Sequence, residues 1–189
     1  MKLKELLEKT RSYRSFDRSV RPTREELVGL IDCIRYTPSS RNAQMLKFRP
    51  VTDPAECDAV LRATRWAAKL TDVTLPPKGH EPAAYILICA DRRILPDADR
   101  FDTDAGIAAE VLMLAATEAG LGGCIIGSFD APALSALLPD CAVPKLVLAV
   151  GKPDETVRLC DPAPDGSVTY YRKDGIHYVE KRRTEDLLL

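Results

Sequence analysis

The sequence lacks the features that mark several large classes of protein. Its formal net charge is only −1 at pH 7, with 27 basic and 28 acidic residues. A nucleic-acid-binding protein usually carries a basic excess large enough to change these totals. No apolar run reaches the length of a membrane-spanning helix, and the first residues alternate in charge, unlike a secretory signal peptide. The sequence therefore predicts a cytoplasmic protein that binds neither nucleic acid nor membrane.

Motifs for metal binding and for nucleophilic catalysis are also missing. The six cysteines form no Cys-x-x-Cys pair, and the two histidines, His80 and His177, stand alone. No metal site is therefore predicted, and each histidine is expected at the surface. The chain has no Gly-x-Gly-x-x-Gly after an expected strand, no Walker lysine motif, no serine or cysteine elbow and no evident carboxylate pair. Because these motifs are missing, we expect any chemistry to be carried out by a bound cofactor.

The patterns that are present predict one domain over residues 1–189, because a chain of this length can bury one sizeable core. Helices are expected at about 3–9, 23–36, 53–61, 102–119 and from 130 onward. Strands are expected at 46–52, 84–90, 124–127 and 145–151. Without a regular strand–helix–strand rhythm, this order favours an α+β sandwich. Residues 153–175, rich in Pro, Asp and Gly, are expected to form an extended excursion.

The expected helix at 102–119 is apolar around most of its circumference. Its large apolar residues are Ile107, Val111, Leu112, Met113 and Leu114, with alanines between them. Such a helix is buried on several sides, and one modest core cannot wrap it fully. Part of its cover is therefore expected from a second subunit, which makes a homodimer the hypothesis.

Two polar segments lie between apolar, periodic ones. The first is Arg11-Ser12-Tyr13-Arg14, which either solubilises a loop or binds an anion. Guanidinium groups next to short hydroxyls suit a phosphate or a ring carbonyl. The second, Pro38-Ser39-Ser40-Arg41-Asn42-Ala43-Gln44, is either a helix stop with turn residues or a further polar binding loop, and Gln44 fits a simple turn poorly.

Two further places invite a functional interpretation. Gly127-Ser128 follows an apolar strand, and a glycine there lets a flat ring approach the backbone N–H groups. Gly120 is expected to do no more than end the preceding helix. Trp66, the sole tryptophan, is either a core residue, which is the safer interpretation, or the lid of a substrate pocket.

Four blocks in this order resemble the FMN-dependent nitroreductases, especially a short subfamily that begins with Arg-Ser-Tyr-Arg. The blocks are Arg11–Phe16, Pro38–Gln44, Asp104–Ser128 and Gly151–Pro153, and together they span nearly the whole chain. The sequence differs from the family pattern at Thr10, where many members have a further arginine, and at Met45, which replaces the usual proline after Gln44.

The resemblance implies a three-layer α+β sandwich with a central antiparallel or mixed sheet flanked by helices. It also implies an intertwined homodimer that holds one FMN per subunit at its interface. The cofactor-binding residues that it implies are Arg11, Ser12, Tyr13, Arg14, Pro38, Ser39, Ser40, Asn42, Gln44, Ile126, Gly127, Ser128, Lys181 and Arg182. Within this set Ser39, Ser40 and Asn42 would come from the partner subunit, and Lys181 or Arg182 would close on the phosphate. Trp66 and Lys69 are expected to line the substrate pocket.

The implied reaction is a ping-pong oxidoreduction. NADH or NADPH reduces FMN and leaves, and a nitroaromatic, a quinone or a similar small electron-poor acceptor then takes the electrons. Arg14 would stabilise the negative charge of the reduced flavin, and a backbone N–H of Gly127 or Ser128 would lie near N5. Three alternatives stay open: other flavin chemistry such as dehalogenation, enoate reduction or flavin consumption; a non-enzymatic redox sensor; and a dimeric scaffold without cofactor.

Overall fold

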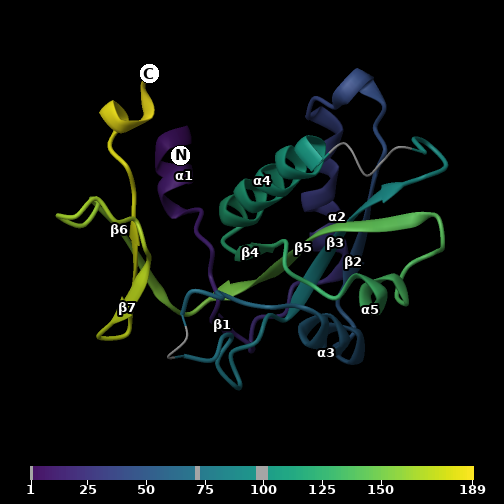
Figure 1. The fold of residues 1–189 in the computed structure, drawn as a ribbon. Helices are drawn as coiled ribbons and strands as arrows, with labels where there is room; N and C mark the ends of the chain where they lie inside the picture. Colours follow the sequence, from purple (N-terminus) through teal and green to yellow (C-terminus); the bar gives the residue numbers. More distant parts are fainter. Residues whose placement is uncertain (1, 71–72, 97–101) are drawn as a thin grey trace.

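The fold is built around one antiparallel sheet. A computed structural model describes residues 2–70, 73–96 and 102–189 (Figure 1). The order β2–β3–β5 forms the centre of the sheet, and both β1 and β4 pair with β5, every pairing being antiparallel. These strands are β1 (Phe16–Asp17), β2 (Leu46–Val51), β3 (Ala84–Asp91), β4 (Gly122–Ile126) and β5 (Ala142–Pro153).

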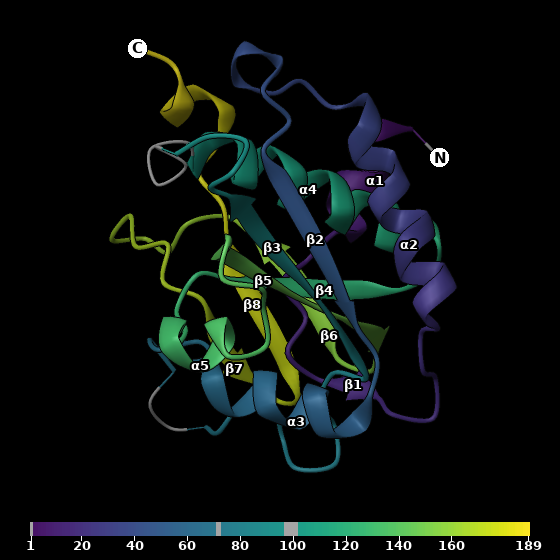
Figure 2. The same cartoon turned by 90° about the vertical axis from the view of Figure 1, so that its right-hand side faces the viewer.

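Helices cover both faces of this sheet, which gives three layers (Figure 2). The central strand β3 is buried along its whole length. Its alternate residues Ala84, Ile86 and Ile88 pack with α2 (Arg24–Asp32) and α4 (Asp102–Glu118). The residues between them, such as Tyr85 and Leu87, pack with α3 (Pro54–Ala63) and α5 (Ala131–Ser135). The predicted α+β three-layer sandwich is confirmed.

Local signals set the helix boundaries where the sequence predicts them. Thr23 and Glu26 form a reciprocal capping box at the start of α2, with Thr23 N–H donating to Glu26 Oε2 at 2.7 Å. The Asp53 carboxylate accepts the first backbone N–H groups of α3. The first helix, α1, covers Leu3–Lys9, and the last turn after α2 is the 3₁₀ helix η1 (Cys33–Tyr36).

A second, smaller sheet forms where the sequence predicts an extended excursion, so this prediction is wrong. Its order is β6–β8–β7, and it stands beside α1, apart from the main sheet (Figure 1). The strands are β6 (Thr156–Cys160), β7 (Tyr171–Lys173) and β8 (Ile176–Glu180), and the 3₁₀ helix η4 (Thr184–Leu187) follows. These strands have three to five residues. Asp174-Gly175, with positive φ at both residues, is a local hairpin signal between β7 and β8. The parallel pairing of β6 with β8 joins residues about 20 apart in sequence and has no local signal.

The longest helix, α4, is buried on one side and incompletely covered on the other. Ala105, Ala109 and Leu112 lie in the core, whereas Ile107 and Val111 are only half-buried. Part of α4 is therefore uncovered in one chain, and its expected cover by a second subunit stays a prediction. Among the residues described, no helix is long and apolar enough to cross a membrane. The assignment of residues 1–189 to one domain stays a prediction.

The close approach of β4 to β5 leaves no room for a side chain at Gly123. A Cβ atom there would lie 2.2 Å from the carbonyl oxygen of Ala149 on β5. We expect Gly123→Ala to lower the free energy of unfolding by about 2 kcal/mol or more, because the strand pair must separate. In the control Gly29→Ala, on the exposed side of α2 with nothing within 4 Å, stability should rise by up to about 1 kcal/mol. Urea unfolding measures both, and equal effects would contradict the close approach of β4 and β5.

Candidate functional site

The first predicted binding segment docks on the beginning of β4. Ser12 forms a parallel bridge with Gly123, and the backbone N–H of Tyr13 donates to the carbonyl of Gly123 at 2.8 Å. Gly122 permits this approach, because a Cβ atom there would lie 2.5 Å from Pro153 Cγ and 2.7 Å from the Tyr13 ring. Gly122 and Gly123 therefore do more than follow a helix end, since they seat the Arg11–Arg14 segment.

The two arginines of this segment keep donors available. The Arg11 guanidinium is half-buried, donates to the carbonyl of Leu7, and has a buried Nε without a partner among the described residues. Burial lowers the pKa of Arg11 from its usual value. Arg14 Nη1 donates to the carbonyl of Ser12 at 3.2 Å, while its Nε and Nη2 have no hydrogen-bond partner in the described part of the chain. Both side chains can therefore donate to an anion or a ring carbonyl.

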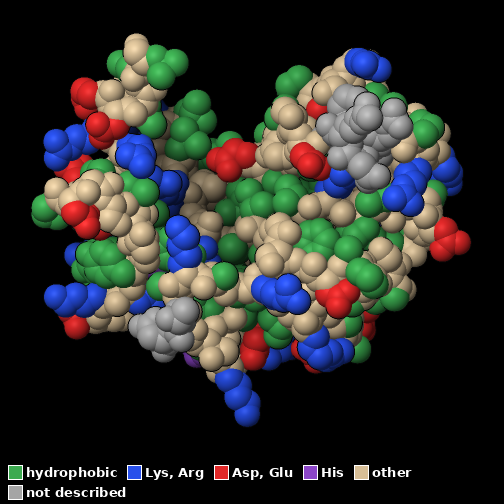
Figure 3. Space-filling view, in the orientation of Figure 1, with side chains coloured by type: hydrophobic (Ala, Val, Ile, Leu, Met, Phe, Trp, Pro, Cys, Tyr) green, Lys and Arg blue, Asp and Glu red, His purple; other side chains and the backbone are tan. Residues whose placement is uncertain are grey.

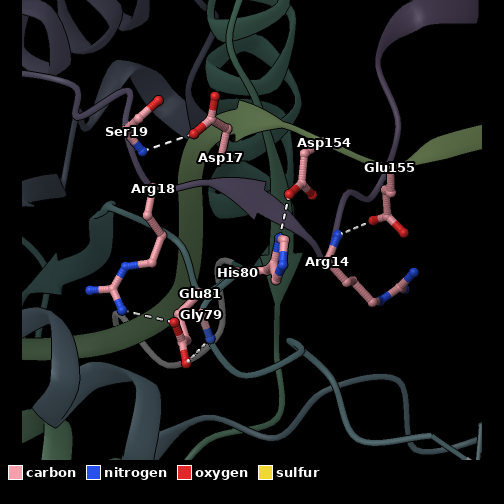
Figure 4. A network of polar contacts seen from close by, with 9 residues as sticks. All are labelled: Arg14, Asp17, Arg18, Ser19, Gly79, His80, Glu81, Asp154 and Glu155. Atoms are coloured by element: carbon pink, nitrogen blue, oxygen red, sulfur yellow. Dashed lines mark hydrogen bonds and ion pairs between the residues drawn. The ribbon is translucent and has the colours of Figure 1, made fainter.

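A buried carboxylate joins this segment to the smaller sheet. Glu155 Oε1 accepts the backbone N–H of Arg14, and Oε2 accepts from the Arg172 guanidinium on β7. Only 5% of the Glu155 side chain is exposed. Figure 4 shows the Arg14 guanidinium pointing away from this bond. Glu155 thus fixes the backbone at Arg14 and leaves its side chain to other contacts.

The loop before β3 is held to the same region by a second polar network (Figure 4). His80 Nδ1 contacts the Asp154 carboxylate, and the carbonyl of His80 accepts the backbone N–H of Phe16 at 3.0 Å. Glu81 accepts from Arg18 at 2.9 Å. About half of the His80 side chain is exposed, so its predicted surface position is confirmed.

The predicted surface position of His177 is wrong, because the residue is buried with only 2% of its surface exposed. It lies on β8 opposite Arg172 of β7, and its ring meets that of Tyr170 edge-on at 5.4 Å. Burial, followed by the positive charges of Arg14 and Arg172, lowers the pKa of His177 to about 4, and a polar interaction with the Tyr171 backbone opposes this in part. Sequence spacing does not reveal this burial, because His177 packs against Arg14, 163 residues away in sequence.

The second predicted segment is a strained loop around the 3₁₀ helix η2 (Ser40–Asn42). Arg41, Asn42 and Gln44 have φ angles of 55°, 52° and 48°, a left-handed conformation that non-glycine residues rarely adopt. Pro38, Ser39, Asn42 and Gln44 line a cavity of about 370 Å³ beside it. A loop that keeps this conformation must be held by strong contacts from outside itself.

Asp104, in the first turn of α4, supplies those contacts. Its buried carboxylate accepts the backbone N–H of Ser40 at 3.0 Å and the Ser40 hydroxyl at 2.9 Å. Both Ser40 donors are therefore committed to the protein, so Ser40 shapes the loop, whereas Ser39 and Asn42 stay more available to a ligand. Asp104 begins the third block that resembles the nitroreductases. Its contact with Ser40, 64 residues away, cannot be predicted from the spacing.

The two predicted segments lie at opposite ends of α4 (Figure 1). Asp104 at its start holds the Ser40 loop, whereas Thr117 in its last turn bonds to Thr10, next to Arg11, with 3.0 Å between the hydroxyl oxygens. Thr10, which stands in place of a family arginine, is buried and is used in packing. A helix of 17 residues is about 25 Å long. One chain therefore does not bring the two segments to the same small ligand.

The far end of β4 carries the third predicted group. Ile126 is buried, and Gly127 and Ser128 are exposed. A Cβ atom on Gly127 would meet only Leu146 Cδ2, at 3.7 Å, so the backbone here faces open space. Since Ser12 pairs with Gly123, Gly127 lies about 13 Å further along the same strand, at about 3.3 Å per residue.

The Trp66 segment lies beside this end of β4. The backbone N–H of Arg65 donates to the carbonyl of Ser128 at 2.9 Å, and Thr64 bridges to Phe129. Trp66 is half-buried against the α3 and α5 core, its Nε1 donating to the Thr64 hydroxyl at 3.0 Å. Trp66 therefore packs against the core, and its segment also lies next to Ser128. The remaining predicted side chains, Lys69, Lys181 and Arg182, are exposed.

The surface between the two sheets is hollowed. In Figure 3 a depression separates the part that carries β6, β7 and η4 from the part that carries α4, with hydrophobic side chains on its floor. Lysine and arginine side chains gather on the side of the smaller sheet. The depression combines positive charge with an apolar floor, which suits a ligand with an anionic group and a flat ring.

Comparisons with known proteins agree with this geometry. A model described as the nitroreductase family matches residues 7–152. A nitroreductase from Exiguobacterium sibiricum in complex with FMN superimposes with a TM-score of 0.70 at 16% identity, over 91% of this chain and 98% of that one. A Staphylococcus epidermidis protein named NAD(P)H:FMN oxidoreductase gives 0.68 at 19%, over 90% and 96%. CLA-ER, a gut-bacterial enone reductase of fatty acid saturation, gives 0.67 at 20%, over 86% and 93%.

The buried His177 predicts that stability depends on pH between about 4 and 6.5. In the unfolded chain this side chain has the ordinary pKa of 6.5, whereas in the folded protein the pKa is about 4. As the pH falls from 6.5 toward 4, the unfolded state binds more protons, so the free energy of unfolding decreases. The glutamine of His177→Gln cannot titrate. Between pH 6.5 and 4 the free energy of unfolding of this variant should therefore fall by up to about 3 kcal/mol less than that of the wild type, at about 1.4 kcal/mol per pKa unit. Urea unfolding at several pH values tests this, and an unchanged dependence would contradict it.

Proposed function

This chain belongs to the nitroreductase family, and we propose that it is a homodimeric flavin oxidoreductase that binds FMN and is reduced by NADH or NADPH. Its acceptors are small electron-poor molecules such as nitroaromatics, quinones or activated double bonds. The family match and the relatives named NAD(P)H:FMN oxidoreductase and enone reductase support flavin oxidoreduction. The separation of the two binding segments by α4 is the observation that carries the dimeric site.

The residues along β4 suit FMN. Arg11 and Arg14, with the Ser12 hydroxyl between them, offer unpaired guanidinium donors for the phosphate and for the carbonyl edge of the ring. The open backbone at Gly127 and Ser128, at the other end of the strand, can accept a flat ring and donate N–H groups to its edge. Bound FMN would supply the hydride-accepting and electron-donating chemistry, for which the chain offers no catalytic side chain.

Arg14 has an electrostatic role in this assignment. A guanidinium is permanently charged, so it favours any ligand state that carries extra negative charge next to it. The effect is larger where the surroundings exclude water, because the effective dielectric constant is lower. Arg14 is half-buried already in one chain and would be buried further by a partner subunit.

A second copy of the chain completes the site. The Pro38–Gln44 loop lies about one helix length from Arg11 and Arg14, so within one chain it cannot contact the same flavin. The half-buried apolar residues Ile107 and Val111 on the outward side of α4 offer a surface on which a second protomer can pack. The partner's loop then brings Ser39 and Asn42 to this chain's arginines.

The acceptor end of the site is assigned to the Trp66 segment, because this segment lies directly beside Ser128. A flat acceptor stacked over the flavin ring would contact Trp66 on one side. Lys69, three residues after Trp66, is exposed. Lys181 and Arg182 follow β8 in an exposed segment and are assigned to the cofactor phosphate. The same pocket serves the nicotinamide donor and the acceptor in turn.

Anaerobic mixing of the FMN-loaded protein with NADH or NADPH tests the reaction directly. The yellow absorbance should bleach rapidly and return when a quinone, a nitroaromatic or an enone is added. The control is free FMN at the same concentration, which should bleach far more slowly. A bound flavin that neither nucleotide reduces would favour a redox sensor, and a protein that binds no FMN would refute the proposal.

Mixed dimers test whether two chains build each site. Arg14→Ala and Asn42→Ala should each weaken FMN binding, Arg14→Ala by about 10- to 100-fold, because a charge-assisted hydrogen bond is lost. A heterodimer of the two variants contains one site with both substitutions and one with neither. Titration with FMN should therefore show half of its sites binding with wild-type affinity.

Arg18→Ala is the matched control for loss of positive charge, since Arg18 lies four residues after Arg14 but is exposed and paired with Glu81. This variant should bind FMN as the wild type does. If the heterodimer of Arg14→Ala with Asn42→Ala regains no tight sites, Arg14 and Asn42 of different chains do not share a flavin.

A further inference from the structure

A cluster of buried and half-buried polar side chains lies where the smaller sheet meets the Arg11–Arg14 segment. We call the five residues the Arg14 cluster: Arg14, Glu155, Tyr170, Arg172 and His177. Four of them, Glu155, Tyr170, Arg172 and His177, lie beyond residue 152, where the match to the family model ends. The cluster therefore joins Arg14 to the C-terminal region.

The hydrogen bond between Arg14 and His177 fixes the state of the imidazole. Arg14 Nη1 lies 3.3 Å from His177 Nε2, and a guanidinium can only donate. Nε2 must therefore be the acceptor, which places the proton of the neutral ring on Nδ1. Nδ1 is buried and has no hydrogen-bond partner among the described residues. The contact with Arg14 therefore fixes the tautomer, and the other polar interaction of the ring is with the Tyr171 backbone.

The charges around His177 keep it neutral. Arg14 faces the ring from the segment before β1, and Arg172 faces it from β7. The one carboxylate of the cluster, Glu155, already accepts the backbone N–H of Arg14 and the guanidinium of Arg172. On the β6 side the neighbour in register is the uncharged Val157. A protonated ring would therefore meet two guanidinium groups with little compensation, whereas a neutral ring can accept from Arg14.

Tyr170 holds the same guanidinium from a second direction. Arg14 Cζ lies 5.4 Å from the centre of the Tyr170 ring, within the range of a cation–π contact. The Tyr170 and His177 rings in turn pack edge-to-face. The side chain of Arg14 is thus held by an acceptor and an aromatic ring, and its backbone is held by Glu155.

We propose that His177 is the positioning residue of Arg14: its neutral imidazole orients the guanidinium so that the two unpaired nitrogens of Arg14 face the flavin. The inference rests on the proposed function, in which Arg14 binds FMN. It makes the C-terminal sheet a part of the flavin site, since His177 and Tyr170 set the side-chain orientation before the ligand arrives. Fixing a ligand-binding side chain in advance reduces the entropy lost on binding.

A double-mutant cycle on FMN affinity tests this, with fluorescence titration of the apoprotein as the readout. His177→Phe, which removes the acceptor, should weaken FMN binding by about 5- to 20-fold, whereas His177→Gln, which keeps an acceptor, should stay within about 2-fold of the wild type. In an Arg14→Ala background, His177→Phe should cause no further loss. A merely structural role would lower affinity equally in both backgrounds.

Tyr170→Leu provides a second variant in case His177→Phe does not fold, as judged by circular dichroism. It should weaken FMN binding in the wild-type background and not in the Arg14→Ala background. Wild-type affinity in both His177→Phe and Tyr170→Leu, or losses that simply multiply with that of Arg14→Ala, would overturn the inference. If Arg14→Ala itself binds FMN as the wild type does, the failure lies in the proposed function and not in the positioning contact.

Discussion

The proposed two-chain flavin site depends on the rigidity and length of α4. This helix separates the Ser40 loop, held at its first turn by Asp104, from the Arg11–Arg14 segment, held at its last turn through Thr10 and Thr117. Because a packed helix does not shorten, no movement within one chain brings the two groups together. A flavin site that uses both groups therefore requires two chains, and in the proposed homodimer the second chain packs on the half-covered side of α4.

Close packing and buried charge define the other half of the site. Gly122 and Gly123 let the arginine segment lie directly on β4, where a single methyl group would collide with the neighbouring strand or with Tyr13. Glu155 then ties that segment to the smaller sheet. These contacts engage the backbone N–H groups of Tyr13 and Arg14 and leave guanidinium nitrogens without partners among the described residues. This is the pattern expected of a binding site built before its ligand arrives.

Local and non-local features of this chain differ in how far sequence predicts them. The capping box at Thr23, the Asp53 cap and the buried strand β3 depend on neighbours in sequence, and all three were predicted. The burial of His177 against Arg14 and the pairing of β6 with β8 depend on partners far along the chain, as does the bond from Asp104 to Ser40. No spacing rule connects such residues, so the resemblance indicated binding segments but not what holds them.

The most direct test of a flavin shared by two chains is sedimentation of the FMN-loaded protein, followed at the flavin and protein absorbances together. If two chains share each flavin, the flavin sediments with a species of twice the 20.8 kDa chain mass, with one FMN per chain. Dilution that separates the chains should release the flavin. Flavin that sediments with a single 20.8 kDa chain, and stays bound there, would contradict it.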